Sequence, residues 1–204
     1  FEWVGNPLRD AICNVPPPEQ RFAGRSGPLR LLVVGGSLGA VALNERVPAA
    51  LALLPPADRP QVVHQAGERH IDALRAAYAA AGVVAECVPF IADMAAHYAA
   101  ADLVICRGGA ITVAELSAVG VGSIIVPLPG AIADEQSANG AFLVDAGGAL
   151  MVPQPELTPA GLAETIAQLS RDKLLGLAVA ARRVAKLDAT SRVAAVCLEF
   201  ARKR

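Results

Sequence analysis

Short apolar runs alternate with longer amphipathic stretches along most of the chain. From Leu29 onward an apolar run, a turn rich in small residues and a segment of helical periodicity follow one another repeatedly. Short β-branched runs, each followed by a helix of about 8 to 17 residues, are typical of a parallel sheet with right-handed crossovers. We predict strands within LRLLVVGG, QVVHQAG, AECVPF, DLVICRGG, SIIVPLPG and ALMVP. The predicted fold class is therefore α/β, a doubly wound, Rossmann-like parallel sheet with helices on both faces.

The predicted helices fall between these strands. They cover about residues 38–54, 68–81, 93–100, 112–119 and 134–146, and the chain from residue 158 onward is predicted to be mostly helical. Residues 14–28, NVPPPEQRFAGRSGP, are rich in proline and glycine, so we expect neither a helix nor a central strand there. The expected organisation is an N-terminal segment with an interdomain linker at residues 1–28, followed by one Rossmann-like domain at residues 29–204.

Composition removes several classes of protein. The mean hydropathy is +0.44, but no apolar window reaches the roughly 18 to 20 residues of a membrane span. Because 18 basic and 19 acidic residues are well mixed, we expect no nucleic acid partner. The four cysteines form no C-x-x-C pair, which favours buried thiols in a reducing compartment over a disulfide or zinc framework. The first residue is Phe1 and no signal peptide follows, so we expect a piece of a longer protein.

Ligands of such folds bind beyond the carboxyl ends of the strands, which makes three loops candidates. The first is GGSLGA, residues 35–40, whose glycines and free amides suit an anion such as a diphosphate. Its spacing is G-G-x-x-G, and the second strand ends in His64 and Gln65, where a dinucleotide fold has an acidic residue. NAD is therefore disfavoured, and a glycine turn used only for packing stays open.

The second loop, CRGGAITVAE, contains residues 106–115. If a helix starts near Ile111, the amides of residues 108–112 and the Thr112 hydroxyl are available to phosphate oxygens. Glu115, expected in the first turn, can accept hydrogen bonds from both vicinal hydroxyls of a ribose. The combination indicates a nucleoside diphosphate. The open alternatives are that Glu115 only stabilises the helix dipole and that Arg107 is an ion-pair partner.

The third loop, PLPGAIADEQSAN, contains residues 127–139. Gln136 and Asn139 are three residues apart, share one helix face and could both reach a polyhydroxylated ligand. The alternative is that Asp134 is an N-cap and both amides are solvated.

Five motifs together resemble the MurG family of bacterial glycosyltransferases, which move N-acetylglucosamine from UDP-GlcNAc to lipid I and so form lipid II. GNPLR, GGSLGA, PFIADM, CRGGAITVAE and DEQSANG occur in the family's order, and the resemblance covers essentially the whole chain. It implies the donor-binding half of a GT-B enzyme, with the active site in the cleft between two Rossmann-like domains. By motif, Arg9 and Ser37 would lie at the phosphate and sugar side of the donor, and the backbone of Ile91 would contact the uracil. The diphosphate would be contacted by Ala110, Ile111, Thr112, Val113 and Ala114. Glu115 would contact the ribose, and Gln136 with Asn139 would contact the sugar.

The resemblance also implies partners. Lipid I, the general base of an inverting transfer and the membrane contact would belong to an N-terminal domain without a counterpart here, at the cytoplasmic face of the inner membrane. We expect no catalytic residue in this chain, UDP-GlcNAc as its ligand and no cofactor or metal, since the sequence has no D-x-D motif or His/Cys cluster. His64, His70 and His97 are expected to be structural or surface residues. This chain alone should bind the donor and transfer nothing.

Several positions depart from the family pattern. Gly108 stands where serine is common, Leu38 where glutamine is common, and Glu135 where histidine or glutamine is usual; Gly122 and Gly140 replace a frequent proline and alanine. Three alternatives stay open: a GT-B transferase for another UDP- or TDP-sugar, a non-catalytic nucleotide-binding module, and a UDP-GlcNAc epimerase, which would need further catalytic acids.

Overall fold

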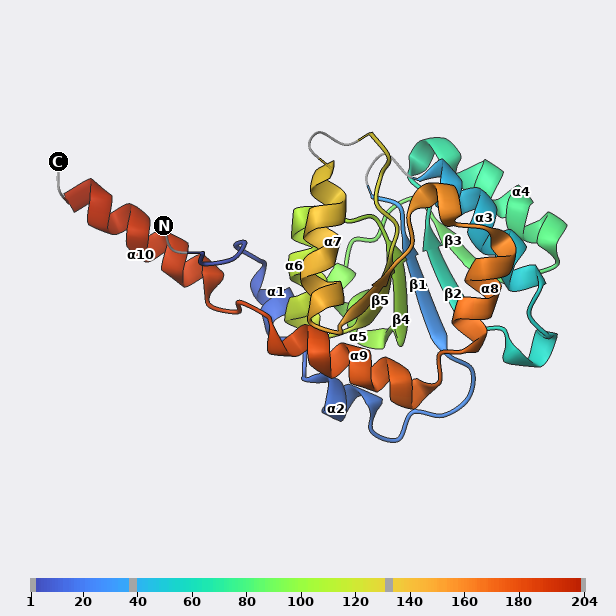
Figure 1. Cartoon of the computed structure of the whole chain (residues 1–204), viewed down its shortest axis with the longest axis horizontal. Coiled ribbons are helices and arrows are strands. Elements are labelled where there is room, and N and C mark those ends of the chain that lie inside the picture. The colour runs from blue at the N-terminus through green and yellow to red at the C-terminus, as the bar shows by residue number, and fades with distance from the viewer. Residues whose placement is uncertain (1–2, 37–39, 131–133, 203–204) are drawn as a thin grey trace.

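The computed structural model describes residues 3–36, 40–130 and 134–202. Its centre is a six-stranded sheet, parallel throughout, with the strand order β3-β2-β1-β4-β5-β6 (Figure 1). The strands are β1 (Arg30–Val34), β2 (Gln61–Gln65), β3 (Glu86–Val88), β4 (Leu103–Cys106), β5 (Gly122–Ile125) and β6 (Ala149–Met151). This order, in which the chain moves outward from β1 and then reverses, is that of doubly wound nucleotide-binding sheets. The predicted fold class is confirmed.

Helices cover both faces of the sheet, as Figure 1 shows. Adjacent side chains on a strand point to opposite faces, so Leu31 and Val33 of β1 enter one hydrophobic cluster and Leu32 enters the other. The first cluster is closed by α3 (Val41–Ala52), α4 (Ile71–Ala81) and α8 (Pro159–Ala167). The second is closed by α1 (Asp10–Cys13), α5 (Met94–Ala100), α6 (Ala110–Val119) and α7 (Glu135–Asp145). Both faces are buried, which explains why the central strands are continuous apolar runs.

The expectation that residues 14–28 contain no helix is wrong. Helix α2 (Pro18–Phe22) lies in this segment, with Pro17 as its N-cap and Pro18 as its first residue. Proline is tolerated in the first turn because its missing N–H would have no intrahelical partner there. Phe22 is only 7% exposed and anchors the helix in the core. The segment is therefore packed against the domain, and the domain boundary at residue 28 stays a prediction.

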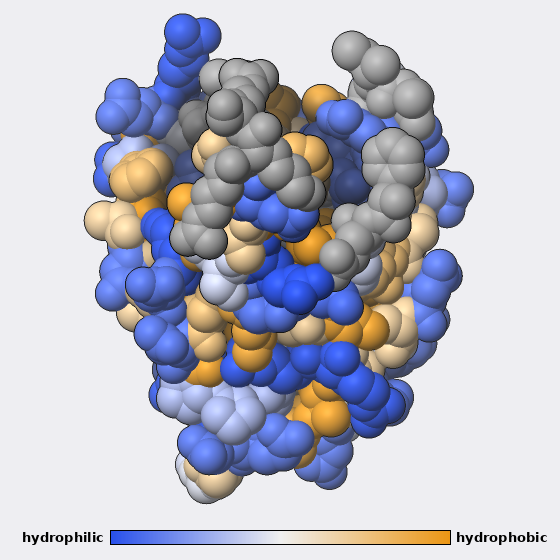
Figure 2. Space-filling model, turned by 90° about the vertical axis from the view of Figure 1, so that its left-hand side faces the viewer, coloured by the Kyte–Doolittle hydropathy of each residue, from blue (hydrophilic) through white to orange (hydrophobic). Residues whose placement is uncertain are grey.

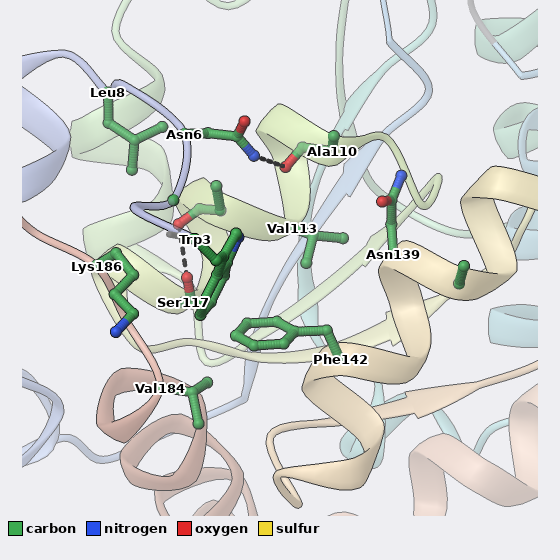
Figure 3. A pocket seen from close by; sticks show the side chains of 13 residues that line it. Trp3, Asn6, Leu8, Ala110, Val113, Ser117, Asn139, Phe142, Val184 and Lys186 are labelled. Carbon is green, nitrogen blue, oxygen red and sulfur yellow. Dashed lines mark hydrogen bonds between the residues drawn. The ribbon is translucent and has the colours of Figure 1, made fainter. Parts of the chain in front are cut away.

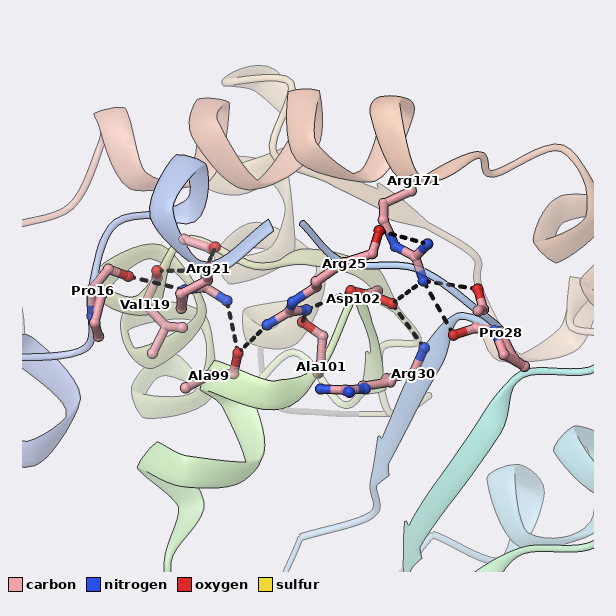
Figure 4. Close-up of polar contacts among 12 residues, drawn as sticks. Pro16, Arg21, Arg25, Pro28, Arg30, Ala99, Ala101, Asp102, Val119 and Arg171 are labelled. Carbon is pink, nitrogen blue, oxygen red and sulfur yellow. Dashed lines mark hydrogen bonds and ion pairs between the residues drawn. The ribbon is translucent and has the colours of Figure 1, made fainter. Parts of the chain in front are cut away.

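A buried carboxylate fastens this segment at the amino end of the sheet (Figure 4). Asp102, whose side chain is fully buried, forms ion pairs with Arg25 and with Arg171 of α9 (Arg171–Arg183), the latter at 3.3 Å. Its second oxygen also accepts a hydrogen bond of 2.9 Å from the backbone N–H of Arg30. One side chain thus joins the N-terminal segment, the start of β1 and the start of α9, at the edge opposite to the predicted site.

The last helix, α10 (Ala189–Arg202), extends away from the body of the domain beside the N-terminal residues (Figure 1). The face at that end mixes apolar and polar side chains without one large apolar area (Figure 2). No helix in the described part of the chain is long and apolar enough to cross a membrane. All four cysteines are free thiols, and Cys106 is buried in β4.

Candidate ligand-binding site at the carboxyl edge of the sheet

The predicted site loops lie together at the carboxyl edge of the sheet. Strands β1 and β4 are neighbours, but α3 follows β1 on one face and α6 follows β4 on the other. Loops that depart in opposite directions leave a crevice at this switch point, which is the usual ligand site of such sheets.

Helix α6 begins at Ala110, with Gly109 in the N-cap position and no side-chain cap. The amides of its first turn have no intrahelical acceptors, and they point out of the helix toward the sheet edge. Ala110 and Ile111 are exposed, Thr112 and Ala114 are half-buried, and Val113 is buried. This end of α6 therefore has free backbone donors, and the binding of an anion there stays a prediction.

Glu115 is the sixth residue of α6 and lies in its second turn, so the first-turn placement was wrong by one turn. Its carboxylate is largely buried, and Oε1 accepts from Nη2 of Arg9 at 3.1 Å. Tyr98 lies behind it, and burial, together with the nearby Cys106 and Glu115, raises the pKa of the Tyr98 phenol well above its ordinary value. Because dipole stabilisation falls off within the first turn, it does not explain a carboxylate here. Arg9, which was expected at the phosphate and sugar side of the donor, forms an ion pair with Glu115.

The two amides of α7 hold neighbouring loops instead of being solvated. Oε1 of Gln136 accepts from the backbone N–H of Gly108 at 3.2 Å and of Leu128 at 3.0 Å. Nδ2 of Asn139 donates to the Gly108 carbonyl at 3.0 Å. Within the described ranges, Nε2 of Gln136 and Oδ1 of Asn139 have no hydrogen-bond partner, so one donor and one acceptor remain for a ligand. Asp134 adopts a left-handed conformation and makes no capping hydrogen bond.

Close packing around Gly108 leaves no room for a side chain at this position. A Cβ atom on residue 108 would lie 2.3 Å from the backbone oxygen of Gln136. A larger residue would push the start of α7 away from the α6 loop. Gly108 and the position of Gln136 are therefore coupled by close packing.

Arg107 braces the loops instead of forming an ion pair. It donates to the carbonyls of Val126 and Pro127 at 3.1 and 3.2 Å and to Oε1 of Gln154 at 2.6 Å. Burial, with a smaller contribution from Arg46, lowers the pKa of its guanidinium. No carboxylate lies within 4.0 Å of Arg107 in the described part of the chain, so the ion-pair alternative is wrong.

The remaining predicted positions lie at the same edge or outside the described residues. Ile91 is buried in the loop after β3, beside Phe90, which is 70% exposed. Ser37, with the neighbouring Leu38, lies outside the residues that the structure describes. Sequence reasoning missed Asn6, whose side chain donates to the Ala110 carbonyl at 3.5 Å.

A cavity of about 220 Å³ opens beside Ala110 and Asn139 (Figure 3). Its wall includes Trp3 and Phe142, whose rings meet edge to face with 5.4 Å between centroids. Nζ of Lys186 lies 5.1 Å from the Trp3 ring centroid. These contacts join the N-terminal segment to α7 and to the connection before α10. No local sequence pattern predicts them.

His64 is a structural residue of the core, as predicted. It is fully buried in β2, and burial lowers the pKa of its imidazole to about 3. Nδ1 of His97 lies 2.8 Å from the Asp93 carbonyl within α5 and its N-cap. In the portion of the chain that the structure covers, no three His, Cys, Asp or Glu side chains are arranged to hold a metal ion.

Fold and site together define a class, a doubly wound α/β domain whose candidate ligand loops lie at the carboxyl edge of its sheet. Among solved structures it is similar to Acinetobacter baumannii MurG, with a TM-score of 0.86 and 40% sequence identity over 92% of this chain and 55% of that one. Residues 30–193 match the model of the glycosyltransferase family 28 C-terminal domain. The chain belongs to this family, which confirms the resemblance stated from the sequence.

Two curated relatives carry the name UDP-N-acetylglucosamine–N-acetylmuramyl-(pentapeptide) pyrophosphoryl-undecaprenol N-acetylglucosamine transferase. The protein of Dechloromonas aromatica (strain RCB) is 58% identical over 98% of this chain and 56% of its own length. That of Azoarcus sp. (strain BH72) is 60% identical over 99% of this chain and 57% of its own length. The chain thus spans little more than half the length of these glycosyltransferases.

Proposed function

We propose that this chain binds UDP-GlcNAc as the donor domain of the transferase that adds N-acetylglucosamine to lipid I, with inversion, to form lipid II. The observation that carries the proposal is the convergence of three features at one sheet edge: the uncapped start of α6, the sheltered Glu115 carboxylate, and the Gln136 and Asn139 amides. The names of the relatives, at 58 and 60% identity, supply the sugar and the acceptor.

Each part of the donor would then have a matching group. Residues 110–114 would enclose the diphosphate and bind it through the free amides of residues 110–112 at the start of α6, with Ser37 near the phosphates, and the backbone of Ile91 would contact the uracil. The ribose hydroxyls would donate to Glu115, whose Oε1 is already fixed by Arg9. The free amide nitrogen of Gln136 and the free oxygen of Asn139 would contact the sugar hydroxyls.

Transfer requires that negative charge on the departing UDP be stabilised. The N-terminus of α6 would do this with preorganised backbone dipoles, so the step would need neither a metal nor a cofactor. We assign the general base, the lipid I site and the membrane contact to the part of the longer relatives that this chain does not span. The whole enzyme would act at the cytoplasmic face of the bacterial inner membrane in peptidoglycan synthesis, and hence in cell shape and division.

Calorimetric titration tests the proposal. UDP-GlcNAc and UDP should bind, UDP-glucose should bind more weakly than UDP-GlcNAc, and NAD should give no heat of binding. Glu115→Gln should weaken UDP about tenfold or more, because the amide cannot accept from both ribose hydroxyls with full charge. The matched control is Glu164→Gln on the exposed face of α8, which should leave the affinity unchanged. Binding of NAD, or equal binding of UDP by Glu115→Gln and the unmodified chain, would contradict the assignment.

A further inference from the structure

A buried glutamine lies between two of the site loops. Gln65 ends β2, is 4% exposed, and has β1 on one side and β3 on the other. Its Nε2 donates to the carbonyl of Gly36, in the turn after β1, and to the carbonyl of Pro89, in the turn after β3, both at 3.1 Å. One amide nitrogen thus bridges two turns that are more than fifty positions apart in the sequence.

Backbone hydrogen bonds at and just after the end of β2 strengthen this bridge. The N–H of Gly35 donates to the Gln65 carbonyl at 3.3 Å, and the N–H of Gly67 donates to the Pro89 carbonyl at 3.1 Å. Both turns are therefore fastened to the end of β2. The loop after β2 has none of the predicted ligand contacts, so its end serves as a support between two loops that do.

The orientation of the Gln65 amide is fixed by its partners. Both are carbonyl oxygens, so only the nitrogen can face them. The other atom, Oε1, is buried and has no hydrogen-bond partner among the residues that the structure describes. A buried acceptor without a donor costs free energy that an apolar side chain of the same length would avoid. The buried oxygen of Gln65 therefore lowers the stability of the fold. The favourable contribution of this side chain comes from the two loops that its nitrogen joins.

We propose that Gln65 is a positioning residue that fixes the distance between the Gly35–Gly36 turn and the turn that carries Pro89 and Ile91. A nucleoside diphosphate that reaches both turns, with its base at one and its phosphates at the other, gains the full affinity of both contacts only when their spacing is preformed. A ligand that reaches one turn alone is insensitive to that spacing. The inference rests on the proposed function, since it concerns the same ligand.

Two substitutions separate positioning from a role in folding. Gln65→Glu keeps the shape but places an acceptor against two carbonyls, and Gln65→Met keeps the length and removes both hydrogen bonds. The matched control is Gln61→Glu, the same change at the exposed opposite end of the same strand. Thermal unfolding of each variant verifies that it is folded. If Gln65→Glu does not fold, the ligand affinities of Gln65→Met alone test the positioning role.

The readout is a comparison of three ligands. UDP should bind Gln65→Met about tenfold more weakly than the unmodified chain, which corresponds to the loss of one to two buried hydrogen bonds. Uridine and inorganic pyrophosphate, followed by ligand-observed NMR, should change less than about twofold, and Gln61→Glu should match the unmodified chain for all three. Unchanged UDP affinity, or an equal loss for all three ligands, would overturn the positioning role while leaving the proposed function intact. Failure of the unmodified chain to bind UDP would overturn the proposed function itself.

Discussion

At the scale of single residues, a buried ionisable group is either neutral or paired with an opposite charge. His64 lies in the core of the sheet, with Nδ1 2.9 Å from the Tyr78 hydroxyl and Nε2 3.1 Å from Oδ1 of Asn44. These contacts fit a neutral imidazole that donates from Nε2 to Asn44 and accepts from Tyr78. The site carboxylate Glu115, by contrast, keeps a partly exposed cationic partner in Arg9.

The buried imidazole predicts loss of stability in acid. The folded pKa of His64 is about 3, below the ordinary value of 6.5, so between these pH values the unfolded chain binds a proton that the folded chain does not. The stabilisation is complete above about pH 6.5 and is lost as the pH falls toward 3. At pH 4.5 this one residue should lower the free energy of unfolding by about 2 to 3 kcal/mol relative to pH 7.

Urea unfolding at pH 7 and pH 4.5 measures the effect. His64→Gln, which does not titrate, should reduce the difference between the two pH values by that amount. Tyr78→Phe removes a hydrogen bond but keeps the buried imidazole, so it should retain the pH dependence. An unchanged pH dependence in His64→Gln would mean that other groups produce the acid sensitivity.

At the scale of elements, one buried carboxylate holds three segments that are distant in the sequence. Asp102 joins the segment after α2, the first residue of β1 and the first turn of α9 (Figure 4). Arg21, in α2 itself, adds hydrogen bonds to the carbonyls of Ala99 and Val119, at 3.2 and 3.1 Å. The amino edge of the sheet is fixed in this way, and the carboxyl edge is left to carry ligand-binding loops.

Asp102→Asn should lower the free energy of unfolding by about 2 to 4 kcal/mol, because it leaves two largely buried guanidinium groups without their counter-charge. Denaturation in urea measures this. The corresponding change Asp72→Asn breaks an ion pair whose aspartate side chain is 93% exposed, and it should cost no more than about 0.5 kcal/mol. Equal effects of the two substitutions would show that the Asp102 cluster is not a structural anchor.

At the scale of the whole molecule, the chain is a single doubly wound sheet with a crevice at one edge. The inverting transfer proposed above needs a general base that takes the proton of the acceptor hydroxyl as it attacks the anomeric carbon. Neither the predicted loops nor the described histidines provide such a group beside the crevice. Under the function proposed above, the site would hold the donor and stabilise the leaving diphosphate without supplying the base.

The chain alone should therefore bind the nucleotide and form no product. Incubation with UDP-GlcNAc and a lipid I analogue should yield no labelled lipid II. The same assay with the full-length protein of Azoarcus sp., 60% identical to this chain, is the positive control. Product formation by the chain alone would mean that the general base lies within it.

Most of the elements were predictable, because each depends on local pattern. The apolar runs and turn residues located all six strands, and the helices from α3 to α7 lie within a few residues of their predicted ranges. Helices α8, α9 and α10 lie in the C-terminal stretch that was predicted to be mostly helical. The missed helix α2 depends on Phe22 finding a place in the core, which no local pattern records. Glu115 was expected in the first turn but is the sixth residue of α6, because the helix begins at Ala110, before its predicted start.

The sequence by itself determined the fold class and the family, since periodicity, glycine spacing and motif order are properties of neighbouring residues; the ligand loops stay a prediction. Only the tertiary structure decided which polar groups meet. Arg9 binds Glu115 across 106 positions, Asn139 binds Gly108 across 31, and Gln65 joins turns on both of its neighbouring strands. Such pairings depend on the order of strands in the sheet, because hydrogen bonds require contact within about 3.5 Å and the chain can bring many different residues to that distance.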